Sequence, residues 1–370
     1  MRTPRIPSMP AELRIDVSAI GANFHRLRSL VRPDTEVAAV VKNDAYGLGI
    51  DLIVPTLVAA GCKSIFVADL REAVQVRRTL ANLAHIYILS GVKESELETC
   101  LSHRLTPVCH SLADALVASR QLPEFVINVD TGFSRFGLTF TEARALVHIS
   151  QRPPDLVISH LACADVRNDP TNRLQRDRFV AMCQVLDPRR RSLAASAAVW
   201  LDQSFHFDLI RAGSALFGLN NAGVEPNPLL PVVQLFARLA DVRTVQRGEA
   251  VGYAASFRAA HSMRIGIVAL GYAVGLPWSG GNAIAAAIGS YMVPVVGRVA
   301  MEYVAIDLSD VPLALCMPGR AVEFLGPRLS VEAMAKAART IPQELLVRLG
   351  SSCPRHYALL SQEPSIGASA

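Results

Sequence analysis

Residues 64–89, SIFVADLREAVQVRRTLANLAHIYIL, contain two short apolar runs separated by a stretch with helical periodicity. SIFVA (64–68) and HIYIL (85–89) are rich in β-branched and aromatic residues, which is typical of strands. In LREAVQVRRTLANL (70–83) the apolar positions recur every three to four residues, which predicts an amphipathic helix. The segment therefore predicts a strand, a helix and a second strand parallel to the first.

The same alternation continues on both sides of this unit. Six further strand-like runs are EVAAVV (36–41), LTPVC (105–109), EFVINV (124–129), DLVISHL (155–161), SLAAS (192–196), and LIRAG leading into ALFGL (209–219). Helical periodicity recurs between them in SLADALVASRQL (111–122), TEARALVHIS (141–150) and RLQRDRFVAMCQVL (173–186). Eight strands alternating with helices predict an α/β fold whose N-terminal part, residues 12–229, is a (β/α)8 TIM-type barrel.

The pattern changes after the proline-rich stretch EPNPLLP (225–231). Strand-like runs separated by Gly, Pro and Ser turns follow, with one helical segment, SVEAMAKAARTI (330–341). The runs are ARLADVRTV (237–245), RIGIVAL (264–270), YMVPVV (291–296) and YVAIDL (303–308). We therefore expect a second, mostly β domain over residues 230–370, with residues 1–11 as a candidate to pack with it.

Composition limits the class of protein. A length of 370 residues suits two domains, and 51% hydrophobic with 19% charged residues excludes a disordered chain. The uncharged stretch from Ile265 to Gly297 is long enough to cross a bilayer, but GYAVGLPWSGGN (271–282) interrupts it with turn-forming and polar residues. We therefore expect no membrane span.

Charge and cysteine content indicate a cytoplasmic protein that does not bind nucleic acid. The net charge of +5 includes no sustained basic run, and we interpret the densest patch, Arg189–Arg191, as a solvated loop. The seven cysteines are scattered and form no CxxC pair, which suits a reducing compartment. The N-terminal residues carry no apolar segment of the kind found in signal peptides.

Lys42 ends the first strand-like run, in VVKNDAYGLG. Reacting groups of TIM-type barrels lie at the C-terminal ends of the strands. An ammonium group at the end of an apolar strand loses hydration, which lowers its pKa and makes the amine a nucleophile for an aldehyde. The alternative is a lysine whose amine simply reaches solvent. Tyr46 follows in the same loop and adds a phenol near this strand end.

Polar residues also follow the later strands: Asp130, Thr131, Arg135, His160, Ser196, Arg211 and Gly213. Each alone could be a helix cap, a turn residue or a satisfied core histidine. The hydroxyl and glycine amides after the last two strands match the position of the usual phosphate site of this fold. His160, Cys163 and Asp165 lack a fourth ligand, so we predict no metal site.

At these residues the sequence resembles the alanine racemases, fold-type III enzymes that depend on pyridoxal 5'-phosphate (PLP). The resemblance covers nearly the whole chain, and the PLP-lysine motif VVKNDAYGLG is its most specific part. The other motifs follow in the family's order: VDTGFSRFG (129–137), ISHLACAD (158–165), IRAGSALFG (210–218), VGYAASF (251–257), LGYAVGLP (270–277) and VVGRVAMEYVAIDL (295–308).

The resemblance implies two catalytic residues. Lys42 would bind PLP covalently and serve as one acid/base, and Tyr253 of the second subunit of a head-to-tail homodimer would serve as the other. Because a tyrosine with a pKa of about 10 is a poor base, it needs help, which His160 linked to Arg211 would give. Arg211 would also face the pyridine nitrogen of PLP.

The resemblance further implies how cofactor and substrate are held. The phosphate of PLP would be bound by Tyr46, Ser196, Gly213, Ser214 and Ser351. The substrate carboxylate and nearby oxygens would be bound by Arg135 and the backbone at Met301, and Tyr272 of the partner would line the access to the site.

Four positions depart from the family pattern, and one of them is Ser351, which stands where a tyrosine that reaches the phosphate is often found. Asn128 stands where many members have a lysine that becomes carbamylated, so the anion that positions Arg135 is missing. We expect the Asn128 amide oxygen, or a chloride ion near Asn128 and Arg135, to replace it. Val274 replaces an acidic residue that is usual in the family, and Glu302 replaces the usual aspartate. Both positions lie where the family has its entry corridor, so these differences affect which substrates are expected to enter.

The expected function is the interconversion of L-alanine and D-alanine, which would supply peptidoglycan precursors or allow D-alanine catabolism. One alternative keeps the cofactor and changes the reaction to a serine or broader-specificity racemase, or to a fold-type III decarboxylase. Another is a non-catalytic PLP-binding protein. Proteins of that kind resemble the barrel alone, whereas here a second domain carries Tyr253 and Tyr272.

Overall fold

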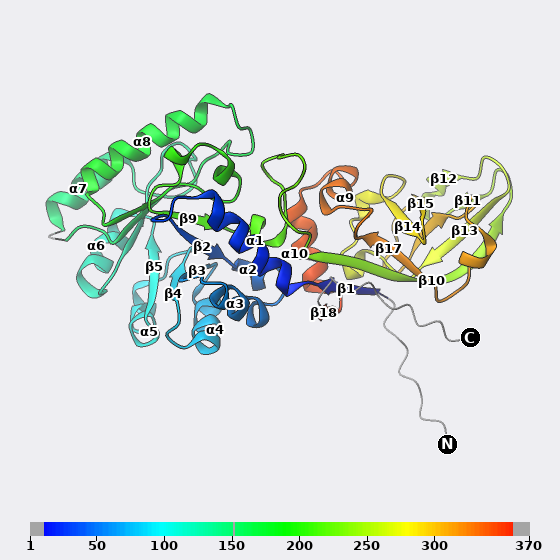
Figure 1. Cartoon of the computed structure of the whole chain (residues 1–370), viewed down its shortest axis with the longest axis horizontal. Helices are drawn as coiled ribbons and strands as arrows, with labels where there is room; N and C mark the ends of the chain where they lie inside the picture. Colours follow the sequence, from blue (N-terminus) through cyan, green and yellow to red (C-terminus); the bar gives the residue numbers. More distant parts are fainter. Residues whose placement is uncertain (1–10, 151, 358–370) are drawn as a thin grey trace, which may run out of the picture. The chain divides into compact units, whose positions relative to one another are not determined.

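The computed structural model describes residues 11–150 and 152–357, and its contacts divide the chain into two units (Figure 1). The barrel unit comprises residues 18–45 and 49–230. The β unit comprises, among the described residues, 11–17, 46–48 and 231–357. The expectation that residues 1–11 pack with the second domain lies, apart from Ala11, outside the described residues.

The barrel unit is built on an eight-stranded parallel sheet in the order β8-β7-β6-β5-β4-β3-β2-β9. A parallel bridge between Ala195, three residues after β8, and Arg211 of β9 joins the two edges of this sheet. The strands are β2 (Glu36–Val40), β3 (Ser64–Val67), β4 (His85–Ile88), β5 (Leu105–Cys109), β6 (Val126–Asn128), β7 (Leu156–Ile158), β8 (Arg190–Ser192) and β9 (Leu209–Ala212). The predicted TIM-type barrel is therefore confirmed.

Helices separate these strands along the chain. They are α1 (Val17–Leu30), α3 (Ile50–Ala59), α4 (Leu70–Leu80), α5 (Leu97–His103), α6 (Leu112–Gln121), α7 (Phe140–Ile149) and α8 (Pro170–Leu186). Short 3-10 helices are η1 (Glu94–Glu96), η2 (Ala197–Trp200), η3 (Gln203–Phe205) and η4 (Ser214–Phe217). Side-chain caps fix where several of them begin: Asp69 accepts from the Glu72 amide at α4, and Ser111 accepts from the Asp114 amide at α6.

Alternate residues of the strands form a buried core cluster, because successive side chains of a strand point to opposite faces. The cluster includes Ala38, Val40, Phe66, Tyr87, Val108, Val126, Leu156, Ile158 and Leu209. The rings of Phe66 and Tyr87 stack at 4.6 Å between centroids. Burial on both faces explains why these strands are almost continuously apolar in sequence.

The seventh barrel strand begins earlier than the sequence predicts. We expected it at residues 192–196, after a solvated loop of arginines, but β8 comprises Arg190–Ser192. Arg190 pairs with Glu36 at 2.6 Å, and Arg191 pairs with Asp208 at 2.9 Å. The loop interpretation was therefore wrong for these two arginines, because carboxylates at the start of β2 and directly before β9 neutralise them.

The β unit contains a second eight-stranded sheet, in which β10 closes a ring of strands by pairing with both β13 and β17. A bulge between Leu239 and Asp241 divides β10 between these partners. The strands are β1 (Ala11–Ile15), β10 (Val233–Val245), β13 (Met263–Val268), β14 (Ala285–Ile288), β15 (Tyr291–Val296), β16 (Val304–Asp307), β17 (Ala321–Leu325) and β18 (Arg355–Tyr357). All pair antiparallel except β1 with β18, and the predicted mostly β character is confirmed.

The remaining elements of the β unit are short. They are a ribbon of β11 (Ala250–Val251) and β12 (Phe257–Arg258), the helices α9 (Val331–Ala337) and α10 (Pro342–Ser352), and the 3-10 helices η5 (Tyr253–Ala255), η6 (Tyr272–Val274), η7 (Trp278–Gly280) and η8 (Leu313–Leu315). The uncharged stretch 265–297 forms β14, β15 and most of β13, together with their connections. No helix among the described residues is long and apolar enough to cross a membrane.

Candidate active site

Lys42 lies two residues after Val40, the last residue of β2, and opens an unusual turn. The next four residues, Asn43 to Tyr46, all have positive φ angles between 53° and 59°. This left-handed conformation costs L-residues about 1–2 kcal/mol each. A backbone arrangement of this kind persists only where its surroundings hold it in place.

Glu72 of α4 supplies much of that support. It is only 8% exposed, and its carboxylate accepts hydrogen bonds from the Asp44 amide at 2.9 Å and the Ala68 amide at 2.8 Å. Asp44 in turn accepts from the Ile50 amide at 2.8 Å. The sequence reasoning missed Glu72. Its spacing from Asp69 matches a helix capping box, which would have marked it as a residue with a backbone partner.

The amine of Lys42 is held ready for nucleophilic chemistry. The side chain is half-buried, and this burial together with the charge of Arg135 lowers the pKa of Lys42, while Glu72 acts in the opposite direction. A lowered pKa increases the fraction of neutral amine at a given pH. The predicted pKa shift is therefore found, and its main cause is the expected loss of hydration.

Arg211 and Lys42 both act electrostatically on His160. Arg211 is 5% exposed, and burial lowers its pKa to about 10. Its guanidinium donates to the carbonyl and hydroxyl oxygens of Ser192 at 2.8 and 2.7 Å and to the Ser159 carbonyl. Burial and the charges of Arg211, Arg135 and Lys42 lower the pKa of His160 to about 3, so this imidazole is neutral. The coupling of His160 to Arg211 is electrostatic.

Ser196 and the start of η4 form a cluster of backbone donors. The Ser196 hydroxyl accepts from the amides of Gly213 at 2.9 Å and Ala215 at 3.2 Å, while Asn221 donates to the Ser214 hydroxyl at 2.9 Å. Ser196 and Ser214 are both buried. Amides and hydroxyls converging after the last two strands suit an oxyanion such as a phosphate.

The loop after β6 carries Arg135. Its guanidinium lies over the Phe133 ring at 4.5 Å from the centroid, and that ring meets His160 edge-on at 5.3 Å. Asp130 shapes the turn by accepting from the amides of Gly132, Phe133 and Ser134 at 2.8–3.1 Å. Burial opposes ionisation of Asp130, but these hydrogen bonds outweigh it and lower its pKa.

Asn128, the last residue of β6, makes two hydrogen bonds through its amide nitrogen. One goes to the Phe136 carbonyl at 3.0 Å and the other to Nδ1 of His110 at 3.3 Å. The opposite ring nitrogen of His110, Nε2, lies 2.6 Å from the Leu89 carbonyl. His110 directly follows β5 and was not among the sequence-predicted residues.

Tyr253, Tyr272 and Met301 of the β unit are exposed. Tyr253 on η5 is 69% exposed, and Met301 is 55% exposed. The loops of Tyr272 and Met301 are joined, because the Tyr272 amide donates to the Ala300 carbonyl and the Ala273 amide to the Met301 carbonyl, both at 3.0 Å. The structure thus brings Tyr272 and Met301 together.

Ser351 lies at the end of α10, beside the segment 46–48. A Cβ atom added at Gly47 would lie 3.1 Å from the Ser351 amide and 2.9 Å from the Val347 carbonyl. Arg355 donates to the Gly47 carbonyl at 2.8 Å, and Tyr357 donates to the Leu48 carbonyl at 2.9 Å. The end of α10 therefore packs on the backbone that directly follows Tyr46.

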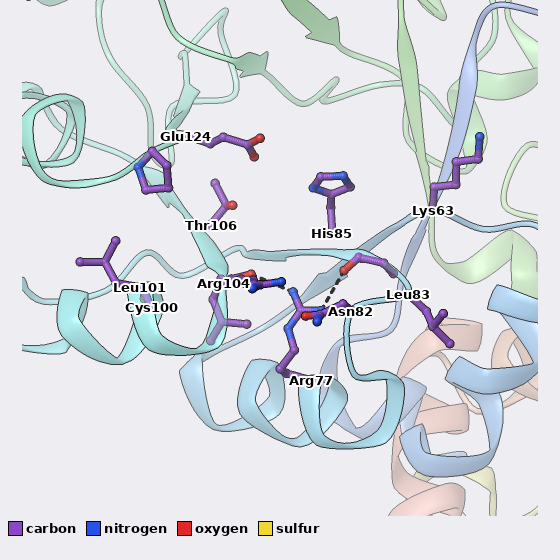
Figure 2. Close-up of a pocket in the computed structure, with 13 residues that line it drawn as sticks. Lys63, Arg77, Asn82, Leu83, His85, Cys100, Leu101, Arg104, Thr106 and Glu124 are labelled. Atoms are coloured by element: carbon purple, nitrogen blue, oxygen red, sulfur yellow. Dashed lines mark hydrogen bonds between the residues drawn. The ribbon is translucent and has the colours of Figure 1, made fainter.

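A cavity of about 660 Å³ lies at the opposite end of the barrel (Figure 2). Its lining includes Lys63, His85 and Glu124, which stand at the starts of strands rather than at their ends. Arg77 donates there to the carbonyls of His103 and Arg104, both at 2.8 Å, so its guanidinium ties loops together. None of the predicted catalytic or binding residues lines this cavity.

The residues at the strand ends fit PLP. They offer a half-buried amine of lowered pKa, backbone donors with hydroxyls for a phosphate, and a buried guanidinium, Arg211, that donates to uncharged oxygens of Ser192 and Ser159. An aldehyde, a phosphate and an aromatic nitrogen are the groups that such a set would bind. Among the described residues, no group of three His, Cys, Asp or Glu side chains could hold a metal ion.

Comparisons with known proteins agree with this assignment. Residues 15–221 match the family model "Alanine racemase, N-terminal domain", and residues 232–357 match "Alanine racemase, C-terminal domain". A biosynthetic alanine racemase of Mesorhizobium japonicum is 45% identical over 95% of this chain and 90% of its own length. A catabolic alanine racemase of the same organism is 37% identical over 94% of this chain and 93% of its own. Among solved structures, the chain is similar to "Crystal structure of alanine racemase from Bartonella henselae with covalently bound pyridoxal phosphate". The TM-score is 0.89 and the sequence identity is 31%, and the match covers 95% of this chain and 100% of that one.

Proposed function

The chain belongs to the alanine racemase family, and from this membership we propose that it interconverts L-alanine and D-alanine with PLP bound covalently to Lys42. The observation that carries the proposal is the electrostatic cluster at the strand ends, where Arg135 acts on Lys42, and Arg211, Arg135 and Lys42 act on His160. Three permanent or potential cations around a neutral histidine suit a cofactor and a substrate that both bring negative charge.

Lys42 and Tyr253 would act as the two acid/base groups. PLP supplies, when bound, an electron-withdrawing system that acidifies the α-proton of the substrate. Lys42, once the substrate amine has displaced it from PLP, would remove or return a proton at the α-carbon on one face, and Tyr253 would do so on the other. Because racemisation needs a proton to leave from one face and arrive on the opposite one, two groups are required.

We propose that Tyr253 reaches the site from the second subunit of a head-to-tail homodimer. Large side chains on the loops of the β unit support this, because Tyr253, Tyr272, Met301 and Tyr303 are each at least 43% exposed. Exposed aromatic and methionine side chains in such a group are typical of a surface that a partner covers.

Arg211 would face the pyridine nitrogen of PLP. A guanidinium can only donate a hydrogen bond, so it keeps that nitrogen as an acceptor and disfavours its protonation. Ser196, Gly213, Ser214, Tyr46 and Ser351 would hold the phosphate. Their roles are proposed from the converging amides and hydroxyls of the barrel unit and from the packing of α10 on Gly47.

Arg135 and the backbone at Met301 would bind the carboxylate of alanine. Asn128 stands where many members of the family have a lysine that becomes carbamylated. Of the two groups expected to replace that anion, the Asn128 amide oxygen and a chloride ion, we propose the amide oxygen. Both amide protons of Asn128 already have acceptors, so a chloride ion would meet an oxygen there rather than a donor.

A cytoplasmic location also remains a proposal, which rests on the scattered cysteines.

The experiment is a chiral assay of the purified protein with PLP and L-alanine, followed by borohydride reduction and peptide mass spectrometry. We expect D-alanine to form and the reduced cofactor to remain on Lys42. Lys42→Ala should abolish both results, whereas Lys63→Ala, at an exposed position outside the site, should leave both unchanged. Cofactor bound without racemisation would favour the non-catalytic alternative, and carbon dioxide release would favour a decarboxylase.

A further inference from the structure

We propose that His110 is a positioning residue that orients the Asn128 amide so that its oxygen, and not its NH2 group, is available to Arg135. This inference rests on the proposed function, in which Arg135 binds the substrate carboxylate. It assigns a role to a histidine outside the residues that the family resemblance marks. It also explains how an asparagine can serve where an anion is usual.

The backbone determines which nitrogen of His110 carries the proton. Nε2 lies 2.6 Å from the Leu89 carbonyl oxygen, which can only accept a hydrogen bond. Nε2 must therefore be the donor, and in a neutral imidazole Nδ1 is then an acceptor. The ring thus presents a lone pair to its second partner, Asn128.

The Asn128 amide is fixed in the same way. Its nitrogen lies 3.0 Å from the Phe136 carbonyl oxygen and 3.3 Å from Nδ1 of His110, so each proton has an acceptor. A flipped amide would place its oxygen against both acceptors and lose both hydrogen bonds. Within the part of the chain that the structure describes, the Asn128 side-chain oxygen has no hydrogen-bond partner, so it is available for a cation.

Packing holds the imidazole where this network needs it. The His110 ring lies 5.1 Å from the Phe136 ring between centroids. A Cβ atom added at Gly91 would lie 3.6 Å from Cδ2 of His110, so the ring lies close to the loop that follows β4. Gly91 has a φ angle of 72°, which favours glycine there.

The network reaches Arg135 through the loop that carries it. The Leu138 amide donates to the Asn128 carbonyl at 2.9 Å, and the Asp130 amide donates to the Leu138 carbonyl at 3.0 Å, which closes the loop on its own base. The Asn128 side chain holds the Phe136 carbonyl, next in sequence to Arg135. The network of His110 and Asn128 therefore holds the backbone that directly follows Arg135.

The test compares His110→Phe, Asn128→Ala and the double variant in the full-length enzyme loaded with PLP. We expect His110→Phe to raise the KM for alanine about tenfold and to change kcat less than about twofold, because substrate binding loses a charge-assisted hydrogen bond. If His110 acts through Asn128, the double variant should have the same KM as Asn128→Ala alone. His110→Gln, which keeps one donor and one acceptor, should recover most of the affinity.

Two controls separate positioning from general damage. His85→Phe makes the same change at an exposed histidine at the other end of the barrel and should leave KM unchanged. Thermal unfolding and the PLP absorbance of each variant report folding and cofactor binding. Independent, multiplying effects of His110→Phe and Asn128→Ala on KM would overturn the inference while the wild type remains an active racemase. A wild type without racemase activity would instead overturn the proposed function.

Discussion

Replacing Glu72 by glutamine tests how the left-handed turn after Lys42 is held. The Glu72 carboxylate is 8% exposed and accepts from two backbone amides, those of Asp44 and Ala68. Glutamine has nearly the same shape but offers one oxygen, so its NH2 group would face one of the two amides. One charge-assisted hydrogen bond is lost, the other becomes neutral, and a buried N–H loses its acceptor.

The magnitude follows from these contacts. A hydrogen bond to a charged group contributes about 1.5–3 kcal/mol, so we expect Glu72→Gln to lower the free energy of unfolding by about 3 kcal/mol. The turn that it supports contains four residues with positive φ, at about 1–2 kcal/mol each, so it should relax when that support is weakened. The loss of the Glu72 charge should also lower the pKa of Lys42 further, because Glu72 is the group that raises it.

Two measurements check this prediction. Urea unfolding of the PLP-free protein gives the change in stability, and the pH dependence of PLP binding to Lys42 gives the direction of the pKa change, with a midpoint at lower pH in the variant. The matched control is Glu142→Gln, at the same position in the first turn of α7, where Glu142 accepts from the Thr139 amide near the surface. Equal stabilities of Glu72→Gln and Glu142→Gln would refute the reasoning.

Two further predictions concern the pH dependence of stability and a close backbone contact. His160 has a folded pKa of about 3, below an unfolded value of about 6.5, so its stabilising contribution is present above pH 6.5 and lost as the pH falls towards 3. His160→Gln should therefore reduce the pH slope of the unfolding free energy between pH 6 and 4 by up to about 1.4 kcal/mol per unit, and an unchanged slope in urea titrations would contradict the assignment. Gly47→Ala should lower the melting temperature more than Gly61→Ala does. Both glycines have positive φ angles, but only at Gly47 would the new Cβ atom meet backbone, 2.9 Å from the Val347 carbonyl oxygen. Equal decreases in melting temperature would show that the contact with α10 costs nothing.

Hydrophobic periodicity was sufficient to predict the barrel. Each strand is apolar because it is buried on both faces, and each helix shows a period near 3.6 because one face is buried. The exception is β8, whose first residues are arginines. Their partners, Glu36 and Asp208, are distant in sequence, so no local pattern could reveal that these charges would be neutralised in a strand.

The site was predictable where motifs mark it and not where it depends on long-range hydrogen bonds. Lys42 was recognised from its motif and strand end, and the family predicted from the motifs is confirmed by the comparisons. Glu72 and His110 were missed, because a glutamate on a helix and a histidine after a strand have ordinary explanations in sequence alone. Only the fold shows that Glu72 binds the turn after Lys42 and that His110 binds Asn128.

Proton exchange during turnover tests the proposed two-base racemisation most directly. The purified protein with PLP is incubated with L-alanine in heavy water, and the α-deuterium content and the optical activity are followed together. We expect deuterium to enter the α-position as optical activity is lost, and Tyr253→Phe to suppress the loss of optical activity while PLP remains bound to Lys42. Loss of optical activity without deuterium at the α-carbon, or full racemisation by Tyr253→Phe, would contradict the roles proposed for Lys42 and Tyr253.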